Sequence, residues 1–118
     1  MGKRILIVDD SSIMRKMIKE TLKSGNHSIV GEAKNGQDAV EMYMACRPDL
    51  VTMDITMRGM DGFEAAREIL KVDENARIIF LSNLDEEKYG QEARQLGARG
   101  FVNKHQPKNI LSLIDELL

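Results

Sequence analysis

The chain has 118 residues, the usual size of one domain, and we expect a single domain over residues 1–118. Its 17 basic and 19 acidic residues give a net charge of −2, which excludes the strongly basic surface typical of nucleic-acid binding. The single cysteine excludes an internal disulfide and indicates a reducing compartment, so we expect a cytoplasmic protein. The first apolar run is too short for a signal peptide or a membrane span.

Short apolar runs predict buried strands, because strands covered on both faces of a parallel sheet are continuously rather than alternately hydrophobic. The runs are residues 5–8, 50–53, 78–81 and 101–102, and a weaker strand is expected at 28–31. Segments with one apolar stripe at helical spacing alternate with them, at residues 13–22, 39–44, 66–70, 89–96 and 110–117. This alternation predicts a doubly wound α/β fold, with five parallel strands flanked by five helices.

Capping residues mark where the predicted helices begin and end. Ser11 or Ser12 can cap the first helix, and Asp61 or Gly62 begins the third. Gly97 suits the left-handed residue that closes the fourth helix, and Pro107 suits the first turn of the fifth. The dipeptide at 35–36, Asn-Gly, is often a hairpin turn, but helical spacing follows it, so we expect a strand-to-helix loop.

Polar residues follow directly after the predicted strands. Asp9 and Asp10 follow the first run, Asp54 the third, Ser82 the fourth, and Lys104 comes soon after the last. Each alone is an ordinary loop residue. In an open parallel sheet, however, ligands bind beyond the carboxyl ends of the strands, so we expect all five side chains at one site.

Three neighbouring carboxylates repel one another unless a cation is present. Magnesium suits such a set, because it binds through one or two carboxylates, keeps several waters and accepts phosphate oxygens as further ligands. The residues therefore predict a Mg2+ site that receives phosphate.

The sequence resembles response-regulator receiver domains over its whole length, most closely the single-domain chemotaxis (CheY-like) type. The motifs that carry the resemblance are Ile-Leu-Ile-Val-Asp-Asp at 5–10, Pro-Asp-Leu-Val-Thr-Met-Asp at 48–54, Met-Asp-Gly at 60–62, Leu-Ser at 81–82, Gly-Ala at 97–98, Phe101 and Lys104. The resemblance implies a flavodoxin-like fold with the strand order 2-1-3-4-5.

The resemblance also implies a role for each site residue. Asp54 would be phosphorylated by attack of its carboxylate on phosphorus, with Lys104 neutralising oxygen charge. Mg2+ would be held by Asp10, the Asp54 carboxylate and the backbone carbonyl of Thr56. Asp9 would act on the metal through water or would secure Lys104.

Ser82 and Phe101 would form the switch. The Ser82 hydroxyl would donate to the acyl phosphate and move inward, and Phe101 would follow, remodelling the face made by the fourth helix, fifth strand and fifth helix. His27 lies in a polar turn, and we expect it to be solvated and without a role.

The partners that the resemblance implies are proteins. A histidine kinase would be the phosphodonor, a downstream protein such as the flagellar motor the target, and a phosphatase a further partner. We expect a monomer, with dimerisation on activation as an alternative, and no enzymatic activity beyond the chain's own phosphotransfer and dephosphorylation. The identity of the kinase and target, and whether the chain is cut from a longer regulator, stay open.

Three residues depart from the family pattern. Arg58 replaces a common proline, Asn83 replaces a very small residue after Ser82, and His105 replaces the proline after Lys104. A cis peptide costs about 2.5 to 4 kcal/mol without proline, so we expect a trans bond before His105. Asn83 leaves the lifetime of the phosphorylated state open.

Three alternative functions fit less well. A haloacid-dehalogenase-type phosphatase needs an aspartate two residues after its nucleophile, where this chain has Thr56. A dinucleotide-binding domain needs glycines after its first strand, where this chain has two acids. A receiver that only binds partners would not need the complete set of acids, serine and lysine.

Overall fold

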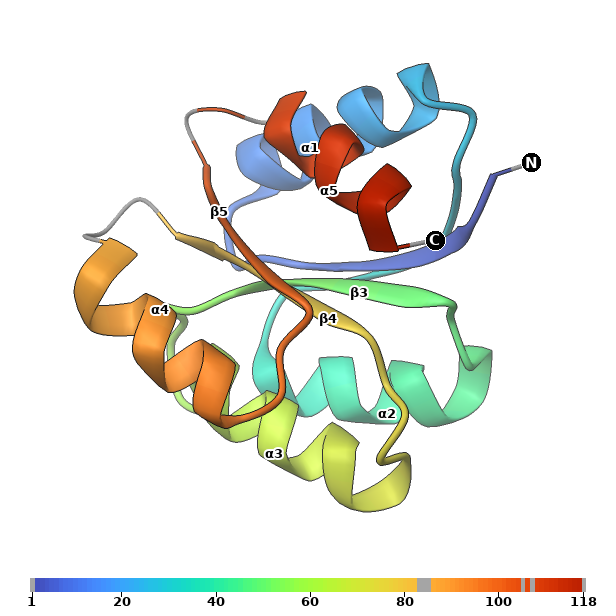
Figure 1. Ribbon diagram of the computed structural model, residues 1–118. Helices are drawn as coiled ribbons and strands as arrows, with labels where there is room; N and C mark the ends of the chain where they lie inside the picture. The colour runs from blue at the N-terminus through green and yellow to red at the C-terminus, as the bar shows by residue number, and fades with distance from the viewer. Residues whose placement is uncertain (1, 83–85, 105, 107, 118) are drawn as a thin grey trace.

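The computed structural model describes residues 2–82, 86–104, 106 and 108–117, in which strands and helices alternate (Figure 1). The strands are β1 (Arg4–Val8), β2 (Ser28–Ala33), β3 (Leu50–Asp54), β4 (Ile78–Ser82) and β5 (Gly100–Asn103). The helices are α1 (Ser12–Ser24), α2 (Gly36–Cys46), α3 (Gly62–Val72), α4 (Glu86–Gln95) and α5 (Lys108–Leu117). Each predicted strand is present and extends one or two residues beyond its predicted run.

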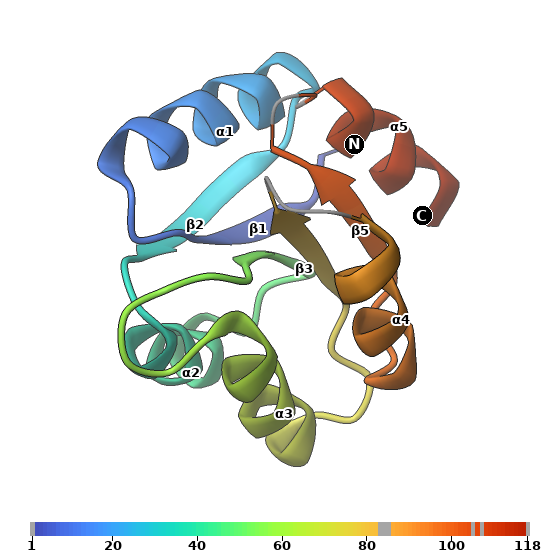
Figure 2. The same cartoon turned by 90° about the vertical axis from the view of Figure 1, so that its left-hand side faces the viewer.

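The strands form one parallel sheet with the order β2-β1-β3-β4-β5, which confirms the predicted fold. Helices α1 and α5 cover one face, and α2, α3 and α4 cover the other (Figures 1 and 2). Among the described helices, none has both the length and the apolar character that a membrane crossing requires.

The sheet divides the core into two layers. Consecutive strand residues point to opposite faces, so Leu6 and Val8 pack beneath α2, α3 and α4, while Ile5 and Ile7 pack beneath α1 and α5. All four side chains are fully buried. This burial on both faces explains why the strands are continuous apolar runs in the sequence.

The helix caps follow the sequence prediction where the structure describes them. The Ser11 hydroxyl accepts from the Met14 amide at 3.3 Å, and the Asp61 carboxylate accepts from the Glu64 amide at 2.9 Å. Asn35 caps α2, which confirms that residues 35–36 lie between a strand and a helix. Gly97 has a positive φ of 89° after α4, as expected of a helix-closing glycine. Pro107 lies outside the described residues.

Candidate functional site

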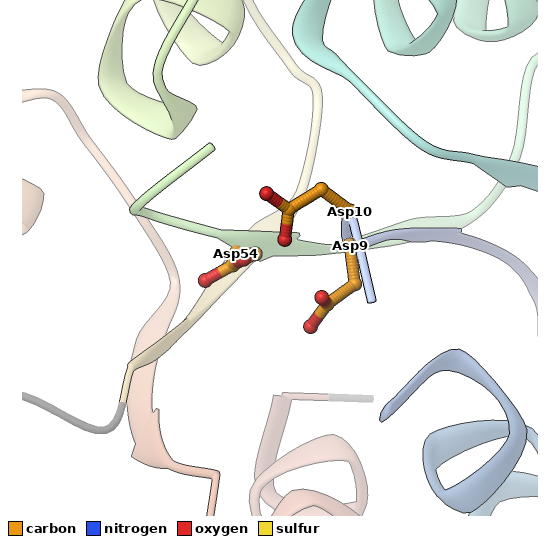
Figure 3. Close-up of side chains that lie close together, drawn as sticks. All are labelled: Asp9, Asp10 and Asp54. Carbon is orange, nitrogen blue, oxygen red and sulfur yellow. The ribbon is translucent and has the colours of Figure 1, made fainter. Parts of the chain in front are cut away.

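Three carboxylates meet at the carboxyl ends of β1 and β3, which are neighbours in the sheet (Figure 3). Asp9 and Asp10 follow β1, and Asp54 is the last residue of β3. One carboxylate oxygen from each lies within 4.8 Å of the others. The prediction that chain-distant acids converge here is confirmed.

The acids differ in their surroundings. Asp9 is fully buried and Asp54 is 3% exposed, whereas Asp10 is exposed to solvent. The Ser11 amide donates to Asp9 Oδ1 at 2.9 Å, within the turn that leads into α1. The site therefore has two buried acids at its base and one at its rim.

Lys104 supplies a positive charge to the two buried acids. Its Nζ lies 2.8 Å from Asp9 Oδ2 and 2.9 Å from Asp54 Oδ1, and its side chain is only 10% exposed. Lys104 follows β5, and β4 lies between β5 and β3, so its long stem crosses the end of β4. The Lys104 amide donates to the Ser82 carbonyl at 2.9 Å, which fixes where the stem begins.

Burial and charge shift the pKa values in this group. Burial raises the pKa of Asp54 to about 6; a hydrogen bond from Lys104 opposes this, and the negative charges of Asp9 and Asp10 add to it. Burial disfavours the charged form of Lys104, but its hydrogen bonds to Asp9 and Asp54 and their charges outweigh burial and raise its pKa. Lys104 is thus held charged between two acids, while the site still lacks positive charge.

The donor atoms present fit a magnesium ion. Asp10 and Asp54 offer carboxylate oxygens, hard ligands of the kind that Mg2+ prefers, and the exposed Asp10 leaves room for metal-bound water. Asp9 is engaged by Ser11 and Lys104, which favours the alternative that it secures the lysine.

The other predicted residues lie at the same edge. Ser82 is 2% exposed, ends β4 and pairs with Asn103 of β5. Thr56 is exposed two residues beyond β3. Phe101 is half-buried on β5, pairs with Phe80 and packs against the core beneath α2, α3 and α4. Asn83 and His105, including the predicted trans bond, lie outside the described residues.

A surface cavity of about 780 Å³ opens beside Asp10. Asn35, at the start of α2, and Met60, in the loop before α3, contribute to its walls. Arg58 and Lys34 also line it, so two positive charges lie on the Asp10 side of the site. The sequence marks Arg58 as a departure from the family pattern but gives no signal for Lys34, because only the fold brings the loops after β2 and β3 together.

Comparisons with known proteins agree with this geometry. Residues 5–115 match the response regulator receiver domain. The chain is 46% identical to the chemotaxis protein CheY of Bacillus subtilis, covering 100% of this chain and 99% of that protein. It is 43% identical to CheY of Thermotoga maritima, covering 99% and 98%.

Solved structures show the same fold. A crystal structure of a CheX–CheY–BeF3–Mg2+ complex from Borrelia burgdorferi aligns with a TM-score of 0.92 and 32% identity, covering 97% of this chain and 87% of that one. A LuxR-family response regulator from Aurantimonas aligns with a TM-score of 0.94 and 30% identity, covering 99% and 85%. With the strand order and the convergence of Asp9, Asp10 and Asp54, these matches show that the chain belongs to the response regulator receiver domain family.

Proposed function

We propose that residues 1–118 form one receiver domain that takes a phosphoryl group from a histidine kinase onto Asp54 with the help of Mg2+. The observation that carries this proposal is the Lys104 ammonium, 2.9 Å from a buried Asp54 that two further acids flank. A structural ion pair needs one acid, whereas this group keeps an excess of negative charge at the mouth of the sheet. That excess suits a divalent cation and, with it, a phosphoryl group.

The chemistry that we propose is a direct transfer. An Asp54 carboxylate oxygen attacks phosphorus, the P–N bond to the donor histidine breaks, and its electron pair leaves with the imidazole ring. The product is an acyl phosphate on Asp54. Lys104 neutralises charge on the phosphoryl oxygens, and the rigid end of β3 aligns the attacking oxygen, which is most of what this reaction needs from a protein.

Asp10, Asp54 and the backbone carbonyl of Thr56 would hold the metal ion. When bound, Mg2+ supplies positive charge to the phosphoryl oxygens and neutralises the carboxylates. Asp9 would keep Lys104 in place from below, since Lys104 is its contact at Oδ2.

The output that we propose is a change of the α4-β5-α5 face, made through Ser82 and Phe101. Ser82 lies at the site edge of β4 and Phe101 on the neighbouring strand, so a shift at the first can reach the second. The face would then bind a chemotaxis-type protein target, such as a flagellar motor. A phosphatase would be a further protein partner. The Borrelia burgdorferi complex supports binding to a second protein, because it contains CheX together with CheY, BeF3 and Mg2+.

We also propose that the protein is cytoplasmic and that it catalyses only its own phosphorylation and dephosphorylation. The lone cysteine is consistent with a reducing compartment. The protein would act as a monomer, with dimerisation on activation as the alternative.

Phosphorylation can be tested with acetyl phosphate and Mg2+, followed by separation on a phosphate-affinity gel. We expect a shifted band that disappears on addition of EDTA and in Asp54→Asn. Asp115→Asn removes an exposed acid from α5 and serves as the matched control, with an unchanged shift. A shifted band that survives in Asp54→Asn would contradict the assignment.

The switch can be tested by amide hydrogen exchange with and without BeF3 and Mg2+. We expect changes at residues 82–89 and around Phe101. Changes confined to α2, on the far side of the site, would contradict the proposed output face.

A further inference from the structure

Arg15 contacts the backbone of the acidic pair. Its Nη1 donates to the Asp9 carbonyl at 2.7 Å from one turn into α1, and its side chain is 19% exposed. This is a charge-assisted hydrogen bond to a main-chain oxygen, which is stronger than a neutral one. We infer that Arg15 is a positioning residue for the Mg2+ site, an inference that rests on the proposed function.

Asp10 depends on its backbone for its position. In the described part of the chain no hydrogen bond or ion pair holds its exposed carboxylate, which contrasts with the buried Asp9. The direction of the Asp10 side chain is therefore set by the peptide that joins it to Asp9. Any freedom in that peptide moves the Asp10 oxygen away from the other carboxylates.

Among the hydrogen bonds of Asp9, one comes from outside the sheet and the turn before α1, and it acts on the peptide bond between Asp9 and Asp10. The Asp9 amide donates to the Ala33 carbonyl at 3.0 Å, and the Asp9 carboxylate accepts from the Ser11 amide. The Asp9 carbonyl is half of the peptide bond to Asp10, and Arg15 holds it. Losing Arg15 would release the Asp9 carbonyl and with it the peptide that leads to Asp10.

Arg15 is itself held in place from β2. Its Nε lies 3.5 Å from Glu32 Oε1, while Lys19 Nζ lies 2.6 Å from Glu32 Oε2. The planar guanidinium can therefore contact Glu32 with one nitrogen and the Asp9 carbonyl with another. A lysine offers its donors from one nitrogen, so it would have to reach both oxygens from a single point, whereas the guanidinium reaches each oxygen with a separate nitrogen.

Two other roles for Arg15 predict different results. A simple ion pair between α1 and β2 would involve Glu32 but not the metal site, and such partly exposed pairs contribute little. The positive charge of Arg15 alone would oppose Mg2+ binding, so its removal would strengthen binding. The contact and the charge thus act in opposite directions, and the test must keep the charge constant.

The test is a Mg2+ titration of the intact protein, followed by the amide NMR shifts of Asp10 and Ser11. We expect Arg15→Lys, which keeps the charge, to raise the Kd for Mg2+ about tenfold, the size typical of residues that orient metal ligands. Lys19→Arg changes the other cation on Glu32 without touching Asp9 and should stay within about twofold of the unchanged protein. Glu32→Asp keeps the charge but withdraws the anchor, and should raise Kd about two- to threefold.

The outcomes separate this inference from the proposed function. If the unchanged protein does not bind Mg2+, the proposed metal site is wrong. If it binds and Arg15→Lys binds equally well, or if Lys19→Arg loses as much affinity as Arg15→Lys, the positioning role is overturned. A matching thermal midpoint and amide spectrum away from residues 9–15 in Arg15→Lys, together with the tenfold loss, supports it.

Discussion

The two edges of the sheet hold similar polar side chains, but these are paired within the chain at the amino edge and leave an excess of acids at the carboxyl edge. At the amino edge, where the strands begin, the Arg4 guanidinium donates to the carbonyls of Cys46 and Arg47 at 2.8 and 2.9 Å. The Arg4 amide donates to the Asp49 carboxylate at 2.8 Å. Here the charged groups serve the end of α2 and the start of β3, and their partners lie within the chain.

Other groups on the amino side are also paired. The Tyr43 hydroxyl donates to Asp73 at 2.7 Å, which joins α2 to the end of α3. The Lys3 amide donates to His27 Nδ1 at 3.0 Å, and His27 is half-buried. The expectation that His27 is solvated was therefore wrong, because Lys3, just before β1, lies beside its turn; that His27 has no functional role stays a prediction.

At the carboxyl edge, two of the three acids share one lysine. Asp9 and Asp54 are buried, and burial raises the pKa of Asp54 although Lys104 contacts it. A chain selected for stability alone would pair or remove such charges, so the imbalance marks the edge that binds a ligand. The two edges thus separate what holds the fold from what serves its function.

The largest expected effect comes from removing Lys104, the cation that contacts both buried acids at the carboxyl edge. Lys104→Met in EDTA should lower the unfolding free energy by about 3 to 5 kcal/mol, because two buried carboxylates lose their counter-charge. Urea denaturation measures this. Lys71→Met, on an exposed lysine that pairs with Glu68, is the control and should cost less than about 0.5 kcal/mol. Equal losses of unfolding free energy in both variants would mean that Lys104 stabilises the protein no more than an exposed surface lysine does.

Removing the negative charge of Asp54 should raise the unfolding free energy, whereas removing the positive charge of Lys104 should lower it. The pKa of Asp54 is raised from 3.8 to about 6, so its protonated form is favoured in the folded state. Its contribution to stability is complete below about pH 4 and is lost as the pH rises through about 6. Asp54→Asn in EDTA should therefore be about 2 kcal/mol more stable at pH 7, with little difference at pH 4. A destabilised Asn variant at pH 7 would contradict this.

At the amino side a similar change should destabilise the protein. Tyr43→Phe keeps the buried ring but removes the hydrogen bond to Asp73, which should cost about 1 kcal/mol at pH 7. That bond is the main reason that the pKa of Asp73 is lowered. The stability it contributes is present above the ordinary aspartate pKa and lost as the pH falls through the lowered one, the reverse of Asp54. Urea denaturation against pH measures it, with Tyr43→Phe in an Asp73→Asn background as the control that should show little further loss.

The sequence predicts the fold and the acids at the site because both depend on regular rules. Continuous apolar runs predict parallel strands, and the carboxyl ends of parallel strands must meet, which brings Asp10 and Asp54 together. The sequence left two roles open for Asp9, and the contact with Lys104, which only the fold reveals, favours one of them. Arg15 and His27 escaped prediction because their contacts depend on where a helix or a turn lies relative to a strand, which no local pattern records.

The smallest expected effect lies between the two edges. Thr52 is fully buried in the middle of β3, between Ile7 of β1 and Ile79 of β4. Within the described residues its hydroxyl has no hydrogen-bond partner, so its burial lowers the stability of the fold without contributing to the contacts at either edge. Thr52→Val replaces the hydroxyl with a methyl group of similar shape and should raise the unfolding free energy by about 1 kcal/mol.

Thermal unfolding can detect that gain, which corresponds to a rise of about 4 °C in Tm for a domain of this size. Mg2+ affinity should stay unchanged, because Thr52 lies opposite Ile7 and Ile79 in the middle of the sheet rather than at the mouth of the site. Thr21→Val, at a half-buried position of α1 whose hydroxyl is not among the buried groups without a partner, is the control and should not stabilise the protein. A less stable Thr52→Val would mean that the Thr52 hydroxyl is hydrogen-bonded in solution. The middle of β3 would then resemble the amino edge, where polar groups are paired.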